Sequence, residues 1–103
     1  AALGLLGRLA EGGERVVVTP GMVELGSRQA DENRAFAAEA AGAATALVVV
    51  GRTNRRALLE GASGGSASVM VVDSRSDAVA WVRDHLGPGD VVLYENDLPD
   101  HYP

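Results

Sequence analysis

Four short runs of contiguous aliphatic residues, rich in valine, constrain the fold of this chain more than any other feature. They are Val16 to Val18, Leu47 to Val50, Val69 to Val72 and Val91 to Leu93. None of them alternates apolar with polar residues, as a strand with one solvated face does. The runs therefore predict strands that are buried on both faces of a parallel sheet.

Segments with helical spacing separate these runs. The predicted helices are Ala1 to Ala10, Gln29 to Ala44, Thr53 to Glu60 and Ser76 to Leu86. Ser27 and Thr53 are residue types that cap helices, and Gly61 is expected to end the third helix. The resulting order, in which helices alternate with strands, is typical of a doubly wound sheet with right-handed crossovers.

The chain of 103 residues fits one domain, residues 1–103, with one core. The predicted fold class is α/β, a Rossmann-like three-layer domain with a mainly parallel sheet of about four to six strands. Because this architecture usually opens on a strand, we expect a preceding strand to lie upstream of Ala1, outside this sequence.

Composition excludes several classes of function. A formal net charge of -5 argues against nucleic acid and anionic membranes as partners. The absence of cysteine excludes disulfides, thiolate metal sites and a cysteine nucleophile. The apolar runs are much shorter than the roughly 20 residues that span a bilayer, and Ala1 to Ala10 lacks the basic start and cleavage site of a signal peptide. We therefore expect a soluble, cytoplasmic protein.

The polar residues gather at one edge of the predicted sheet. Ligands of open parallel sheets bind beyond the carboxyl ends of the strands. The segments that follow the four runs are Thr19 to Gly26, Gly51 to Asn54, Asp73 to Arg75 and Tyr94 to Asp100, and they are more polar than the loops at the opposite edge. This asymmetry predicts a functional face at the carboxyl edge.

Arg52, Thr53 and Asn54 are the candidates for contact with a nucleotide or another anion. They follow a strand and open a helix, where free backbone N–H groups and the helix dipole favour negative charge. The alternative is a structural turn, in which Gly51 makes the bend, Thr53 caps the helix and Arg52 is solvated.

Candidates for the amino substrate or for domain closure lie in two other places. Glu24 can position an ammonium group or a partner domain, and Asn33 can reach back to the loop that holds Glu24; a solvated carboxylate and a helix-surface asparagine are the alternatives. After the last strand come Glu95, Asn96 and Asp97. The acids there resemble Mg²⁺ ligands in type, but a solvated tail explains them as well, so no metal site is assigned.

No catalytic residue is assigned either. The sequence holds no nucleophile–base pair, no Gly-x-Gly-x-x-Gly and no phosphate loop of the Walker type. From its residues alone, the chain is a small α/β domain for ligand binding or docking.

Three stretches resemble the C-terminal domain of MurF-type Mur ligases. Residues 16–26 (VVVTPGMVELG) are similar to its first strand and loop, and residues 48–54 (VVVGRTN) to its next strand and turn. Residues 90–100 (DVVLYENDLPD) are similar to the tails of some MurF-like ligases. The resemblance extends from about residue 9 to residue 100 and covers nearly the whole chain.

The resemblance implies a three-domain enzyme of peptidoglycan precursor synthesis that joins D-alanyl-D-alanine to a UDP-muramoyl tripeptide. Such an enzyme uses ATP and Mg²⁺ to activate the carboxylate as an acyl phosphate. The phosphate loop belongs to the central ATPase domain, which is the expected partner, and the UDP-sugar to an N-terminal domain; both lie outside this sequence. The C-terminal domain closes over the central one. We therefore expect the isolated domain to bind no cofactor and to be inactive.

Two departures from the family pattern leave alternatives open. An Asn-rich segment of the nucleotide site would lie upstream of Ala1. Where many MurF enzymes have a Lys-Gly-Ser-Arg-like turn after the last strand, residues 94–97 are Tyr-Glu-Asn-Asp. A Mur-like ligase with a different amino acceptor is one alternative, and a stand-alone module that binds a small anion or a protein is another. A phosphoacceptor receiver domain is disfavoured, because Thr19 and Pro20 occupy the place of its acidic pocket.

Overall fold

A computed structural model describes residues 13–96, in which strands alternate with helices. The strands are β1 (Arg15–Thr19), β2 (Ala46–Val50), β3 (Ser68–Val72) and β4 (Val91–Tyr94). Each contains one of the predicted valine-rich runs, so the prediction of four strands is confirmed. The helix predicted at Ala1 to Ala10 lies outside the described residues.

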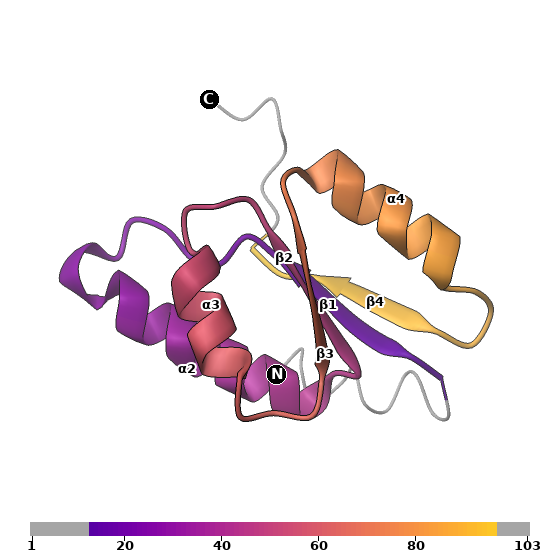
Figure 1. Ribbon diagram of the computed structural model, residues 1–103, viewed down its shortest axis with the longest axis horizontal. Helices are drawn as coiled ribbons and strands as arrows, with labels where there is room; N and C mark the ends of the chain where they lie inside the picture. The colour runs from indigo at the N-terminus through magenta and orange to yellow at the C-terminus, as the bar shows by residue number, and fades with distance from the viewer. Residues whose placement is uncertain (1–12, 97–103) are drawn as a thin grey trace.

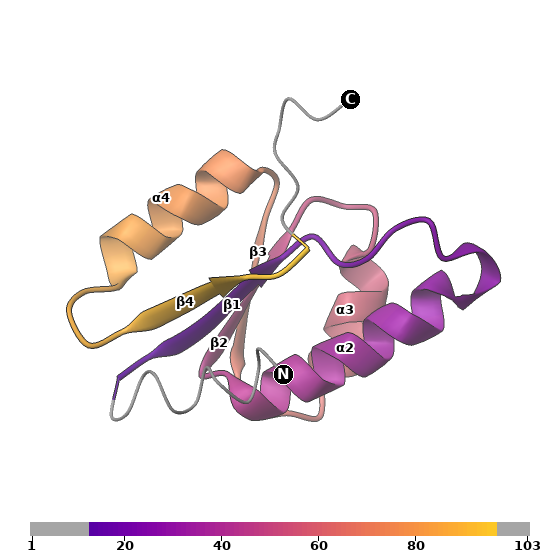
Figure 2. The ribbon, with the colours of Figure 1, turned by 180° about the vertical axis from the view of Figure 1, so that it is seen from behind.

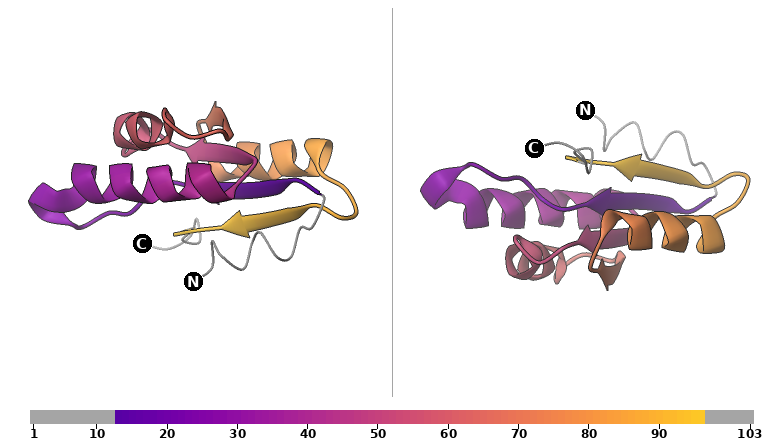
Figure 3. Two further views of the ribbon diagram at one scale, coloured as in Figure 1. Left: turned by 90° about the horizontal axis from the view of Figure 1, so that it is seen from below. Right: turned by 90° about the horizontal axis from the view of Figure 1, so that it is seen from above.

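The strands form one parallel sheet in the order β3-β2-β1-β4. Val17 of β1 lies opposite Leu47 on one side and Leu93 on the other. Figure 3 shows β4 at the border of the sheet, beside β1. The chain steps outward from β1 to β3 and then crosses back to place β4 on the other side of β1. This reversal is the switch point of a doubly wound, Rossmann-like sheet, and it confirms the predicted fold class.

Helices cover both faces of the sheet, which gives three layers. The helix α2 (Gln29–Ala43) and the shorter α3 (Arg55–Ala62) lie on one face, and α4 (Arg75–His85) lies on the other (Figures 1 and 2). A short 3-10 helix, η1 (Gly26–Arg28), precedes α2. Within residues 13–96, no helix is long and apolar enough to cross a membrane.

The core consists of two apolar clusters, one on each face of the sheet. Val17, Leu47 and Val49 pack against the alanines of α2 and against Leu58 of α3. On the other face, the core residues are Val16, Val18 and Val48, with Ala78 and Trp81 of α4 over them. The expectation of complete burial on both faces holds for β1 and β2. It is wrong for β3 and β4, which are only partly buried because they form the two borders of the sheet.

Two predicted helix caps are wrong, although α2 begins at Gln29 as expected. Ser27 lies within η1, and α2 begins after Arg28 without a side-chain cap. Thr53 is not a cap, because α3 begins at Arg55 after Asn54. The Asn54 amide is bonded to the loop after β1 and does not cap α3. By contrast, the hydroxyl of Ser74 accepts a hydrogen bond from the Asp77 N–H and caps α4.

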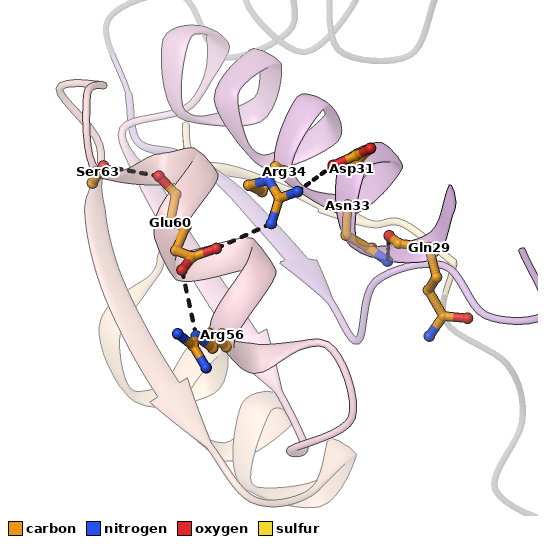
Figure 4. Close-up of polar contacts among 7 residues, drawn as sticks. All are labelled: Gln29, Asp31, Asn33, Arg34, Arg56, Glu60 and Ser63. Carbon is orange, nitrogen blue, oxygen red and sulfur yellow. Dashed lines mark hydrogen bonds and ion pairs between the residues drawn. The ribbon is translucent and has the colours of Figure 1, made fainter. Parts of the chain in front are cut away.

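Gly61 does not end the third helix but lies inside it, where α3 packs closely on α2. A Cβ on Gly61 would lie 2.1 Å from the carbonyl oxygen of Arg34, so only glycine permits this approach of the two helices. Figure 4 shows the polar contacts beside it: Arg34 of α2 donates to Glu60 of α3 at 3.2 Å, and Arg56 donates to the same carboxylate at 3.4 Å. The contact between Arg34 and Glu60 joins the two helices along their exposed side, whereas Arg56 and Glu60 both belong to α3.

Candidate functional site

A groove of about 420 Å³ lies at the carboxyl edge of the sheet and takes residues from beyond all four strands. Its walls are formed by Pro20, Gly21 and Val23 after β1, Val50 to Thr53 at the end of β2, Asp73 to Arg75 after β3 and Asn96 after β4. The predicted gathering of these four segments at one edge is therefore confirmed. The carboxyl edge is also where open parallel sheets bind ligands.

The loop between β1 and η1 is held in place by two buried asparagines. The Oδ1 atom of Asn33 accepts a hydrogen bond from the Met22 N–H at 2.8 Å, and its Nδ2 donates to the Met22 carbonyl at 3.0 Å. Just before α3, the Nδ2 of Asn54 donates to the carbonyls of Pro20 and Met22 at 3.0 and 3.1 Å. The prediction that Asn33 reaches back to this loop is confirmed, but Asn33 is fully buried and does not lie on the helix surface.

The second N–H of the Asn33 amide and the Oδ1 atom of Asn54 also form hydrogen bonds. Asn33 Nδ2 also donates to the carbonyl of Gln29, and Gln29 Nε2 donates to Asn54 Oδ1, both at 2.8 Å. Gly21 has a φ of 82°, and a Cβ there would lie 2.6 Å from Asn33 Oδ1. The hydrogen bonds of Asn33 and Asn54 thus hold the loop in place, and this loop forms one wall of the groove.

Arg52 and Thr53 lie on the opposite wall and are both exposed. The backbone turns sharply before them, because Gly51 has a φ of 77°. An anion in the groove would meet the Arg52 guanidinium and the Thr53 hydroxyl, which are good donors to phosphate and carboxylate oxygens. Asn54 is 5% exposed and does not line the groove, and its side chain bonds instead to the loop after β1.

The other candidates are distributed unevenly around the groove. Asn96 lines it, whereas Glu24 and Glu95 do not. Glu24 is exposed, with a φ of 65°, on the loop beyond Val23. The backbone N–H of Glu95 donates to the Val18 carbonyl and continues the pairing of β4 with β1. Asp97 lies outside the described residues. The binding roles of all these residues stay predictions.

A second groove, of about 560 Å³, lies between α2 and α3 and shares Thr53 with the first one. Its charged residues already pair with one another. Arg34 is held by Asp31 and Glu60, and the hydrogen bonds that it donates to these two carboxylates raise the pKa of the Arg34 side chain. Arg56 also pairs with Glu60. The arginines of this groove are therefore already engaged by carboxylates of the same two helices.

Two residues of the carboxyl edge were not singled out as candidates from the sequence. Arg55 donates to the Gly51 carbonyl at 3.1 Å and to Asp73 Oδ1 at 3.2 Å, so it ties the end of β2 to the end of β3. Asp73 also lies 3.8 Å from the Nη2 of Arg52. No local pattern signals this contact, because it joins segments about twenty positions apart. No group of three or more His, Asp or Glu side chains that could hold a metal ion occurs in the described range.

Comparison with known proteins identifies the family. A search of curated proteins found no match to the chain. The family model described as "Mur ligase, glutamate ligase domain" matches residues 1–94, which is most of the sequence. The fold agrees with this match, because the sheet is parallel and Rossmann-like. The chain therefore belongs to the Mur ligase family, as its glutamate ligase domain.

Proposed function

We propose that the chain is the C-terminal domain of a MurF-type ligase, which adds D-alanyl-D-alanine to a UDP-muramoyl tripeptide. The Mur ligase family consists of ATP-dependent amide ligases of peptidoglycan precursor synthesis that use ATP and Mg²⁺. The MurF type is favoured by residues 16–26, whose sequence VVVTPGMVELG resembles the first strand and loop of that domain. The observation that carries the proposal is that this loop forms a wall of the carboxyl-edge groove.

In this proposal the carboxyl edge faces the central ATPase domain of the same enzyme. Arg52 and Thr53 contact the nucleotide or another anionic group, and Asn54 holds the loop after β1 in place. Asn33 fixes the loop that carries Glu24, and Glu24 contacts the amino substrate or the partner domain. Asn96 lines the far side of the groove, next to Glu95 and Asp97. In the same proposal, the Mg²⁺ ion that the family uses is held by the partner domain.

The domain supplies binding and closure and carries out no chemical step. The contacts of Arg52 and Glu24 orient the reacting groups, and the closed domain shields these groups from water. Orientation and exclusion of water provide much of the rate enhancement of such transfers. By itself the domain is expected to hydrolyse no ATP.

The experiment that tests the proposal is amide ligation by the full-length protein that contains this chain. UDP-muramoyl tripeptide, D-alanyl-D-alanine, ATP and Mg²⁺ are supplied, and the protein is compared with a version that lacks these 103 residues. We expect the dipeptide adduct from the full-length protein and none from the truncated one. Adduct formation without the domain contradicts the proposal.

A second candidate function is favoured by one observation. After β4 the chain reads Tyr-Glu-Asn-Asp over residues 94–97, in place of the basic turn of many MurF enzymes, so a Mur-like ligase with a different amino acceptor is the alternative. The same assay separates the two functions, because a panel of amines then identifies the acceptor that elicits ATP turnover. A stand-alone binding module predicts no ligation with any acceptor.

A further inference from the structure

Asp73 occupies a particular position in the carboxyl-edge groove, between two arginines. It follows β3 directly, and its Oδ1 atom receives both contacts: Arg55 Nη2 at 3.2 Å and Arg52 Nη2 at 3.8 Å. The carboxylate is 69% exposed and lines the groove together with Arg52. A negative charge therefore lies beside Arg52, whose guanidinium is a candidate donor to an anionic ligand.

The two arginines are held very differently. Arg55 is 26% exposed, and it donates to the carbonyls of Gly51 and Val72 as well as to Asp73. Arg52 is 80% exposed, and its distance to Asp73 is beyond hydrogen-bonding range. Arg55 thus fixes Asp73 in place, while Arg52 is free to turn toward another partner.

We propose that Asp73 is an internal counter-ion for Arg52 and determines how strongly the groove binds anions. The inference rests on the proposed function, in that it takes this groove to face an anionic group. An incoming anion draws Arg52 away from Asp73 and is repelled by the carboxylate that stays with Arg55. Asp73 therefore weakens the binding of free anions and favours a ligand whose own charge is partly neutralised.

The test uses inorganic tripolyphosphate as the probe, at low ionic strength, where contacts between exposed charges are least screened. The 103-residue chain is titrated as wild type and as Asp73→Asn, and binding is followed by NMR on the Arg52 side-chain Nε–H. We expect Asp73→Asn to bind about fivefold more tightly, which is the size of effect that one exposed charge at this range produces.

The matched control is Asp84→Asn. Asp84 is 65% exposed and lies 3.7 Å from an arginine, Arg83, but it belongs to α4 and does not line the groove. The same charge is removed there without changing Arg52. Equal affinities of wild type and Asp73→Asn, an absence of binding by both, or an equal gain in Asp84→Asn would each overturn the proposal.

A double-mutant cycle separates a local action from a general effect of charge. In an Arg52→Gln background, the substitution Asp73→Asn is expected to give a clearly smaller gain in affinity, because only the direct repulsion between Asp73 and the anion is then removed. A gain of the same size in this background contradicts the proposal. Thermal unfolding of each variant checks that the fold is kept. A negative result here leaves the ligation assay of the full-length protein unaffected, so the two proposals fail separately.

Discussion

Asn33 of α2 and Asn54, the residue before α3, donate hydrogen bonds to the same acceptor, the carbonyl oxygen of Met22, at 3.0 and 3.1 Å. One backbone oxygen in the loop after β1 thereby joins two helices that are separate in the sequence. Both side chains are buried and none of their polar atoms lacks a partner. The hydrogen bonds of these two side chains hold the loop at the groove. We therefore expect substitutions of either asparagine to affect both the position of the loop and the stability of the domain.

Replacing Asn33 with Ala is therefore expected to destabilise the domain strongly. Three hydrogen bonds are lost, and buried polar groups of Met22 and Gln29 are left without this partner. We expect the free energy of unfolding to fall by about 3 kcal/mol, measured by urea denaturation. The control is Glu39→Ala, an exposed position on the same helix, which should change stability by less than about 0.5 kcal/mol. Equal effects of the two substitutions would contradict the buried role of Asn33.

Gly61 and Gly42 form a matched pair, because both lie within helices and only one touches a neighbour. Gly61→Ala drives a Cβ into the Arg34 carbonyl and is expected to cost about 2 kcal/mol or more as α2 and α3 separate. Nothing lies within 4 Å of a Cβ on Gly42, so Gly42→Ala should stabilise the domain by about 0.5–1 kcal/mol. Thermal unfolding measures both, and a shift of the same sign in the two variants would refute the close packing.

The two hydroxyl residues that precede α3 and α4 differ in their role as caps. Ser74→Ala removes the hydrogen bond from the Asp77 N–H and is expected to cost about 1 kcal/mol. Thr53→Ala removes no cap, because α3 begins after Asn54, and should cost less than about 0.5 kcal/mol. Chemical denaturation of the two variants, side by side, decides this prediction; a larger loss for Thr53→Ala would mean that Thr53 caps α3 after all.

Stability in acid should depend on Asp90. Its carboxylate accepts hydrogen bonds from the backbone N–H of Glu14 and of Gly87, and these hold its pKa below the ordinary value of 3.8. A lowered pKa in the folded state stabilises the fold above the unfolded value, and this contribution is lost as the pH falls through the folded value.

Asp90→Asn is therefore expected to lower the melting temperature at neutral pH and to lose less of it than wild type does on acidification. Melting curves on either side of the ordinary value of 3.8 give this comparison. The control is Asp84→Asn, which removes an exposed carboxylate without such bonds to backbone N–H groups. If wild type and Asp90→Asn respond identically to acid, the two hydrogen bonds do not contribute.

The strands and the layer order were predictable from the sequence because the signal is local. A valine-rich run without polar residues is typical of a strand in a parallel sheet, and each of the four runs lies inside a strand. The position of the groove followed from the same pattern, since parallel strands end at one edge. Ser74 was not among the predicted caps, although serine is a typical capping residue and it does cap α4.

The errors arose where distant contacts override local preference. Thr53 is a residue type that often caps helices. However, Asn54 donates hydrogen bonds to the carbonyls of Pro20 and Met22, and α3 begins at Arg55 instead of at Thr53. Gly61 was expected to end the helix, whereas glycine is required there because α2 lies too close for a Cβ atom. The contact between Arg55 and Asp73 had no sequence signal, because helical spacing says nothing about the neighbouring strand.

The most direct test of the account is steady-state ligation by the full-length enzyme with Arg52→Gln, compared with Arg83→Gln. Both arginines are highly exposed, at 80% and 72%, but only Arg52 lines the groove. We predict that kcat/KM falls about tenfold or more for Arg52→Gln, as expected for one charge-assisted contact, and is unchanged for Arg83→Gln. Equal activity of the two variants would contradict a role of the carboxyl-edge groove in ligation.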